Sequence, residues 1–301
     1  MSLDPEPVPT VVDPVTPNVN VVAGERKQAR RENFRLLIKR PGFVIGALVS
    51  LFWVVCAIFG DAITPYDPLN FRTTKHLKPF GKYIFGTDQS GRDIVSRVMA
   101  GARDVLIVAP PAAIFGVLAG TMLGLIMGYF GGWVDSVLSR VVDAFLALPV
   151  LLIALLALVT LGKSRVVVII VVSILFAPVV SRTIRAAVLA ERDLDYVTSA
   201  RLRGEGSIFI MFREILPNVS GPIVVELTVR IGYAVFTIAT LSFLGVGPPP
   251  PSPDWGAQVS DGYGVLSAGI WWPTIFPALA IATLVIAVNL MADAVQSVLE
   301  G

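Results

Sequence analysis

Long runs without a charged residue restrict what this chain can fold into. Residues 42–60, 105–134 and 266–291 contain no Asp, Glu, Lys or Arg. A helix needs about 20 apolar residues to cross the roughly 30 Å of hydrocarbon in a bilayer. Only 15% of all residues are charged, whereas an ordinary soluble domain has about 25%. The sequence therefore predicts an all-α, polytopic membrane protein.

Proline and glycine clusters divide the apolar sequence into separate spans. Two prolines in Thr64–Pro68 (TPYDP) end the first span, and Gly131-Gly132 ends the second. The four prolines at 248–251 are expected to prevent any helix between the last two spans. Residues 41–301 are predicted to form one transmembrane domain with six spans, at about 42–62, 104–130, 141–161, 166–187, 221–246 and 268–298.

The charge distribution near the amino terminus predicts the orientation. Residues 1–25, rich in Pro and Val, are expected to form a disordered cytoplasmic tail. Residues 26–40 carry seven Lys and Arg with apolar residues between them, which predicts a basic amphipathic segment on the cytoplasmic surface. Because positive flanks stay in the cytoplasm, both termini are expected inside. The loop at 63–103 is then external, and the loop at 188–220 is cytoplasmic.

Several functions are excluded by what the chain lacks. Cys56 is the only cysteine and His76 the only histidine, so no internal disulfide and no Cys or His-pair metal site is possible. The LGKS at 161–164 is not a phosphate-binding loop, because Ala157 stands where that motif requires Gly. No residue arrangement suggests catalysis, and a net charge of +2 gives no basis for nucleic-acid binding. We therefore expect a non-catalytic chain without a cofactor or metal of its own.

The second span contains small residues at helical spacing. Gly116, Gly120, Gly124 and Gly128 are each four residues apart and lie on one face of a helix. Such a face lets another helix backbone approach closely, which stabilises helix pairs in membranes. We interpret it as a helix-packing face.

The fifth span contains two opposite charges. An unpaired Arg near a helix centre costs roughly 2.5–3.5 kcal/mol in a bilayer. Glu226 and Arg230 stand four residues apart with the acid first, so they can pair on one face. Two interpretations remain open for this in-membrane polar pair: a structural ion pair between helices, or the polar lining of a translocation path.

Residues 191–218 read as a helix, a glycine corner and a second helix. Asp193 and Asp195 are placed to cap and charge-complement a helix start. A short helix is predicted over 196–203, and Gly204 suits a helix end with positive φ. Ser207 could then cap a second helix.

The second helix is predicted over 208–215, and Pro217 can open the next span in its first turn. Ser199 and Ala200 are small, so the corner could enter a partner's groove, where Arg201 and Arg203 could make charged contacts. The alternative is a polar loop that merely connects two spans.

This stretch resembles the cytoplasmic loop of ATP-binding-cassette importer permeases. The family pattern is Glu-Ala-Ala, three residues, Gly, nine residues, Ile, one residue, Leu-Pro. Four positions match it: Ala200, Gly204, Leu216 and Pro217. Four differ: Thr198, Ser199, Glu214, and Arg203, which stands where an apolar residue is usual.

Further segments are similar to the C-type subunit of the dipeptide/oligopeptide/nickel class of these permeases. One departure is Ile238, where many relatives have Glu. The matching segments are PYDP (65–68), FGTDQSGRDIVSRVMAGAR (85–103), YFGGWVDSVLSRVVDAFLALP (129–149), LSFLGVGPPPPSPDWG (241–256) and FPALAIATLVIAVNLMADA (276–294).

The resemblance implies a six-helix, type I permease bundle in the bacterial cytoplasmic (inner) membrane. It implies a second homologous permease, two ATP-binding-cassette ATPases that bind ATP and Mg, and an extracytoplasmic binding protein that delivers a peptide. The loop at 195–217 would couple this chain to one ATPase. The residues implied for that role are Asp195, Tyr196, Ser199, Ala200, Arg201, Arg203, Gly204, Ser207, Leu216 and Pro217.

Other functions remain possible at this stage. The same kind of importer could carry nickel or another metal chelate, glutathione or another small solute. A membrane scaffold or sensor would not need a corner-shaped loop together with the polar pair. An ion-driven transporter in one chain is disfavoured, because the sequence shows neither an internal repeat nor a dense set of carboxylates in its spans.

Overall fold

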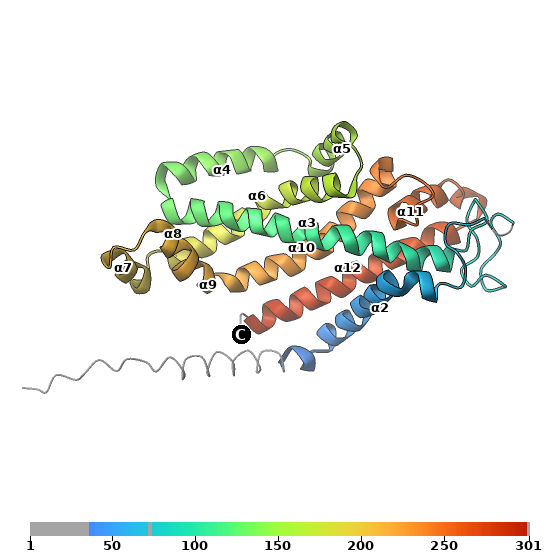
Figure 1. The fold of residues 1–301 in the computed structure, drawn as a ribbon, viewed down its shortest axis with the longest axis horizontal. Helices are drawn as coiled ribbons and strands as arrows, with labels where there is room; N and C mark the ends of the chain where they lie inside the picture. Colours follow the sequence, from blue (N-terminus) through green and yellow to red (C-terminus); the bar gives the residue numbers. More distant parts are fainter. Residues whose placement is uncertain (1–35, 72–73, 300–301) are drawn as a thin grey trace, which may run out of the picture.

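A computed structural model describes residues 36–71 and 74–299, and these parts of the chain are helical and irregular, with one isolated β-bridge between Thr87 and Asp93. Five long helices lie side by side along the long axis (Figure 1). They are α2 (Pro41–Ile63), α3 (Ile94–Phe130), α6 (Arg165–Glu191), α10 (Ser220–Leu241) and α12 (Trp272–Leu299). Each is long and apolar enough to cross a membrane.

The sixth candidate span is a bent pair of helices. The prediction of one helix over 141–161 is wrong: α4 (Gly132–Leu146) and α5 (Val150–Leu161) meet at 83°. Pro149 lacks an N–H and disfavours helical geometry at the residue before it, so the helix stops and restarts there. Figure 1 shows α5 turned away from the direction of α4.

Helix α3 begins ten residues before the predicted start of the second span. Residues 94–103, predicted as part of the external loop, are therefore helical. The Asp93 carboxylate caps the helix by accepting from the backbone N of Ser96 at 2.8 Å. An apolar run marks only the part of a helix inside the bilayer, whereas the helix itself can continue into water. The 37 residues of α3 extend about 55 Å, well over the roughly 30 Å of hydrocarbon.

The expectation that no helix lies between the last two spans is also wrong. Helix α10 continues through a π-helical turn, η2 (Ser242–Val246), and the prolines end before α11 (Trp255–Tyr263) and the short 3₁₀ turn η3 (Leu266–Ala268). The Asp254 carboxylate caps α11 by accepting from Ala257 N at 2.9 Å. The prolines thus separate η2 from α11, but they do not prevent α11 from forming.

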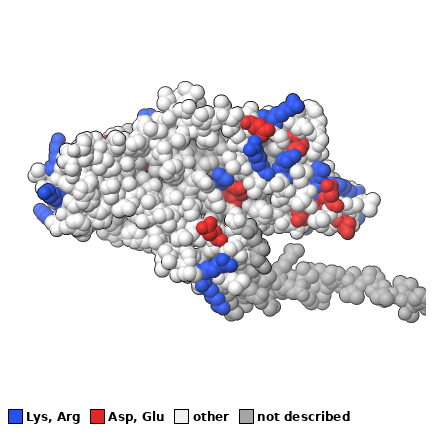
Figure 2. All heavy atoms as spheres, turned by 180° about the vertical axis from the view of Figure 1, so that it is seen from behind, with Lys and Arg blue, Asp and Glu red and all other residues white. Residues whose placement is uncertain are grey.

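The predicted tail, 1–25, and residues 26–35 of the basic segment lie outside the described residues. Residues 36–39 of that segment are helical, and Arg40 leads into α2. On the face shown in Figure 2, charged side chains gather at one end of the long axis and over the part toward the other end, with a broad, largely uncharged zone between them. This distribution is the one expected of a protein that crosses a bilayer.

The predicted glycine face of α3 lies against α6. A Cβ atom on Gly120 would come within 2.5 Å of Val180 Cβ, and one on Gly124 within 2.8 Å of Ile184 Cβ. Gly116 and Gly128 are equally close to α6. Any larger residue at these positions would force the two helices apart, so the packing depends on glycine.

Candidate functional site

Residues 192–219, here called the α7–α9 segment, form a compact group of short helices at one end of the molecule (Figure 1, left). Helix α7 (Asp195–Leu202) is followed by a corner, by α8 (Ser207–Phe209), by a π-helical turn, η1 (Ile210–Ile215), and by α9 (Leu216–Asn218). The predicted loop at 188–220 extends one turn into α6, which ends at Glu191.

Gly204 forms the corner with a φ of +80°. Its backbone N–H bonds to Arg201 O at 3.0 Å, and the N–H of Glu205 bonds to Ala200 O at 3.2 Å, so both close the end of α7. No atom outside its chain neighbours lies within 4 Å of where its Cβ would be. Glycine is therefore needed here for backbone conformation, and the space beside it is open.

The capping residues differ from those predicted. Leu194 is the N-cap of α7 and Asp195 lies in its first turn, where its charge still favours the helix N-terminus. Ser207 is the first residue of α8 rather than its cap, which is Gly206. Neither Asp195 nor Ser207 supplies a side-chain cap bond to these helices.

The predicted α-helix over 208–215 is mostly a π-helical turn. Leu216 N bonds to Met211 O, five residues back. Pro217 has no N–H to donate to Arg213 O, as a continuous α-helix would require. Such π-turns occur often at functional sites.

One side of the α7–α9 segment packs on the bundle, and the other side is exposed. Val197, Ala200 and Ile215 are fully buried in a cluster with Ile184 and Val188 of α6. Of the two small residues predicted for a partner's groove, only Ser199 is exposed. Large apolar side chains are also exposed: Leu202 by 85%, Ile208 by 72% and Phe212 by 43%. Exposed apolar groups on a rigid segment indicate a contact surface.

Tyr196 fastens the segment to α6. Its hydroxyl donates to Glu191 Oε2 at 2.7 Å. Burial and this hydrogen bond raise the pKa of Tyr196 to about 12. The phenol therefore remains a donor at neutral pH.

Both predicted arginines make contacts within the chain. Arg201 donates to Arg192 O at 3.2 Å, and its guanidinium lies 5.6 Å from the ring centre of Tyr129. Arg203 lies 3.5 Å from Glu214 and 3.9 Å from Glu205. Arg203 and Glu214 were noted separately in the sequence as departures from the family pattern. The structure shows that they face each other across the corner.

The predicted polar pair lies between α6 and α10. Arg230 Nε is 2.9 Å from Glu226 Oε2, and each side chain is 12% exposed. The hydroxyl of Thr183, on α6, donates to Glu226 Oε1 at 2.7 Å. Thr183 was not identified from the sequence, because its partner is 43 residues away.

A network of buried charges lies at the opposite end of the bundle. Arg97, at the start of α3, donates to Ser252 O at 3.0 Å and to Pro68 O and Pro251 O at 3.3 Å. Its Nε is 3.5 Å from Asp88, which also pairs with Arg92 at 2.7 Å. These residues belong to the segment at 85–103 that matched the family, and they join loop 64–93 to the prolines.

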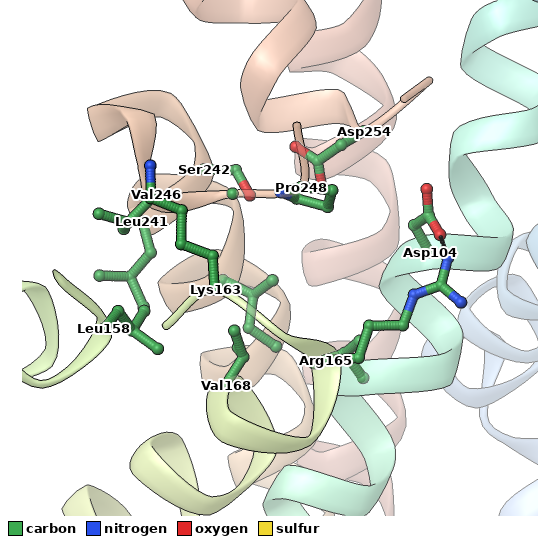
Figure 3. A pocket seen from close by; sticks show the side chains of 13 residues that line it. Asp104, Leu158, Lys163, Arg165, Val168, Leu241, Ser242, Val246, Pro248 and Asp254 are labelled. Carbon is green, nitrogen blue, oxygen red and sulfur yellow. Dashed lines mark hydrogen bonds and ion pairs between the residues drawn. The ribbon is translucent and has the colours of Figure 1, made fainter. Parts of the chain in front are cut away.

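A small cavity beside this network contains further charges (Figure 3). Lys163 donates to Gly245 O at 2.6 Å, and Arg165 pairs with Asp104 of α3. Burial raises the pKa of the Asp254 carboxyl, while the bond from Ala257 N lowers it. The cavity volume is ≈ 30 Å³, enough for one or two waters and far below the roughly 300 Å³ or more of a ligand pocket.

Comparison with known families agrees with this architecture. Residues 120–300 match the family of binding-protein-dependent transport system inner membrane components. This chain belongs to that family. Residues 30–79 match the N-terminal transmembrane domain of oligopeptide transport permease C, so both parts of this permease have a family assignment.

Individual relatives cover nearly the whole permease. The dipeptide transport system permease protein DppC of Haemophilus influenzae is 36% identical over 266 residues, 86% of this chain and 90% of the relative. The di/tripeptide permease DppC of Pseudomonas aeruginosa is 34% identical over 90% of this chain and 91% of its own. The glutathione permease GsiD of Pectobacterium atrosepticum is 34% identical, with 90% of each chain covered.

Proposed function

We propose that this chain is one permease subunit of an ATP-driven importer that carries di- or oligopeptides across the bacterial cytoplasmic membrane. The observation that carries the proposal is the match of both parts of the chain to this family, together with relatives whose names specify dipeptides and di/tripeptides. Both termini and the α7–α9 segment would lie in the cytoplasm, and loop 64–93 would face outward.

The α7–α9 segment would be the contact with an ATPase. Leu202, Ile208 and Phe212 expose apolar surface around the Gly204 corner, and Tyr196 holds that surface against α6. A groove in a partner could cover these side chains, and movement of the partner would reach α6 directly. The ATPases would bind ATP and Mg, and this chain would bind no cofactor.

Three kinds of partner follow from the proposal. A second homologous permease would complete the path, two ATP-binding-cassette ATPases would lie on the cytoplasmic side, and an extracytoplasmic binding protein would deliver the peptide. The runner-up is the same machine for another solute, such as a metal chelate or glutathione. The glutathione permease among the relatives is the observation that keeps it open, since glutathione is itself a small peptide.

Replacing Gly204 tests the coupling role. In Gly204→Arg, a bulky charge occupies the open side of the corner and the residue must hold a positive φ, so the ATPase should be lost from the purified complex or its ATP hydrolysis uncoupled from uptake. The measurements are co-purification of the ATPases, ATP hydrolysis and uptake of labelled dialanine, glutathione and a nickel chelate by vesicles.

Gly269→Arg is the matched control. Gly269 also has a positive φ, +76°, and open space around it, and it follows the turn η3 at the other end of the bundle, so the same added charge and backbone strain should leave the ATPases bound. Unchanged co-purification and uptake in Gly204→Arg would refute the coupling role. Uptake of only the chelate by the unmodified complex would refute the peptide assignment, and uptake of only glutathione would select the runner-up over a di- or oligopeptide importer.

A further inference from the structure

A connected row of polar side chains crosses from α4 to α6 and then to α10. Asp143 of α4 pairs with Arg182 of α6, next to Thr183, which donates to Glu226 of α10. Glu226 pairs with Arg230 at 2.9 Å, and the Arg230 guanidinium lies 5.2 Å from the ring centre of Tyr233. We call these residues the polar row: Asp143, Arg182, Thr183, Glu226, Arg230 and Tyr233.

Much of the polar row is open on one side. The side chains of Arg182 and Asp143 are 55% and 59% exposed, and Tyr233 is 54% exposed. All of these residues belong to helices assigned as candidate spans. Ionised groups in membrane spans face water or protein rather than lipid, so the surface formed by the polar row itself faces water or protein.

The row extends from the α7 end into the middle of the bilayer. Thr183 lies eight residues before the end of α6 at Glu191. Tyr233 lies thirteen residues from each end of the Ser220–Val246 span, or about 20 Å at 1.5 Å per residue. The polar row therefore ascends from the cytoplasmic side of the proposed orientation to about half the depth of the membrane.

The opposite helices expose a different kind of surface. On α2, Leu48 and Ile58 are 61% and 68% exposed, and on α12, Ile286 is 57% exposed. These apolar side chains suit lipid. The helices of the polar row also expose apolar side chains, such as Phe236 of α10 by 57%, so what distinguishes the two sides is charge. Residues 42–60 of α2 and 272–291 of α12 contain no Asp, Glu, Lys or Arg.

We propose that the polar row lines the water-filled path along which the peptide leaves the middle of the membrane for the cytoplasm. The inference rests on the proposed function and identifies which face of this subunit meets the substrate. Arg182 is 55% exposed and suits the carboxylate end of a peptide, since guanidinium binds carboxylate at two points. Asp143 is 59% exposed and suits the ammonium end, because an exposed ion pair exchanges its partners readily. Glu226 and Arg230 are each 12% exposed and pair with each other, so they would line the path without binding the peptide ends.

The single cysteine of this chain makes the inference directly testable. Cys56 is 1% exposed, and Cys56→Ser removes the one thiol of this chain. Thr183→Cys, which removes a methyl group and replaces the hydroxyl by a thiol, and Tyr233→Cys then report on the polar row. The complete importer in nanodiscs is treated with a charged methanethiosulfonate, and labelling rates are measured by mass spectrometry without nucleotide and after vanadate trapping with ATP.

Two matched controls report on the apolar side. Leu48→Cys lies seven residues from the start of α2, a depth close to that of Thr183. Ile286→Cys lies at the middle of α12, as Tyr233 does in its own span. The reagent reacts with the thiolate, and an apolar environment raises the pKa of a thiol. Each pKa unit of such a rise lowers the thiolate fraction about tenfold. The two path positions should therefore react at least about tenfold faster than their controls in one of the two states.

Labelling of Tyr233→Cys that is no faster than that of Ile286→Cys in both states would overturn the inference, because that residue would then face protein or lipid. Dialanine supplied with its binding protein during turnover should slow the labelling of Thr183→Cys and leave Leu48→Cys unchanged. Unchanged labelling of both would overturn the peptide contact. Labelling measures water access and does not depend on which solute is taken up. If the complex imports another solute, Tyr233→Cys should still be labelled rapidly, although dialanine is not taken up.

Discussion

The two ends of the bundle differ in how deeply their arginines are buried. At the 64–93 end, Arg97 is 2% exposed, pairs with Asp88 and donates to backbone carbonyls from two loops. At the α7 end, Arg203 is 55% exposed and its nearest carboxylate oxygen, on Glu214, is 3.5 Å away. A buried charge is costly unless every partner is present, whereas an exposed pair exchanges readily with water.

The apolar residues show this contrast only in part. Trp255 is fully buried and its indole N–H donates to Val98 O at 2.7 Å, and Trp272 N–H donates to Thr87 O at 3.2 Å. At the α7 end, Leu202 and Ile208 remain uncovered. The 64–93 end also exposes apolar side chains, Phe71 by 72% and Phe80 by 79%, so apolar surface that a partner can cover lies at both ends. The two ends therefore differ in their buried arginine and tryptophans, which the outer side of the α7–α9 segment does not contain.

Removing Arg97 should have the largest effect on stability. Arg97→Met leaves Asp88 without this charged partner and three carbonyls without this donor, and breaking a buried pair costs about 3–5 kcal/mol. We expect a large loss of purified protein and of thermal stability in detergent. Lys78→Met, on the exposed part of the same loop, should change stability by less than about 0.5 kcal/mol. Equal stability of the two variants would show that the 64–93 end is no more rigid than the α7 end.

Removing Glu226 should have an intermediate effect. Glu226→Ala leaves the largely buried Arg230 and the exposed Thr183 without this acceptor, at a cost of about 1–3 kcal/mol. Thermal unfolding and peptide uptake are the measurements. Thr228→Val is the control, because the hydroxyl of Thr228 donates to Val224 O of its own helix. Normal abundance, stability and uptake in Glu226→Ala would mean that water satisfies Arg230.

Reversing the corner pair should have the smallest effect. Arg203→Glu and Glu214→Arg each place like charges together, and exposed pairs of this kind are worth about 0.2–1 kcal/mol. The double reversal should recover most of the stability and of the stimulated ATP hydrolysis lost in either single variant. A double-mutant cycle measures the coupling. A coupling as large as the effect of Arg97→Met would remove the contrast between the two ends.

Local patterns in the sequence predicted a substantial part of this fold. Five of the six spans appear as apolar runs, because the bilayer requires about 20 apolar residues whatever packs around them. The positive φ of Gly204 was also predictable, since a helix end followed by a turn favours glycine. The glycine spacing in 116–128 indicated a packing face from its period alone.

Other features could not be derived in this way. The break at Pro149 was missed because residues 141–161 are apolar on both sides of it, and the early start of α3 was missed because Arg97, Arg103 and Asp104 interrupt the apolar run. Helix α11 starts at the Asp254 cap. This cap was missed because the run of prolines just before it was taken to exclude any helix there.

By itself, the sequence determined the membrane class, the number of candidate spans, the corner at Gly204 and the family resemblance, because each depends on residues close together in the chain. Only the tertiary structure decided which charges meet: Arg203 with Glu214, Thr183 with Glu226, and Arg97 with Asp88 and the carbonyls of Pro68 and Ser252. The reason is physical. An ion pair depends on a few ångströms between side chains, and helix packing, not sequence spacing, sets that distance.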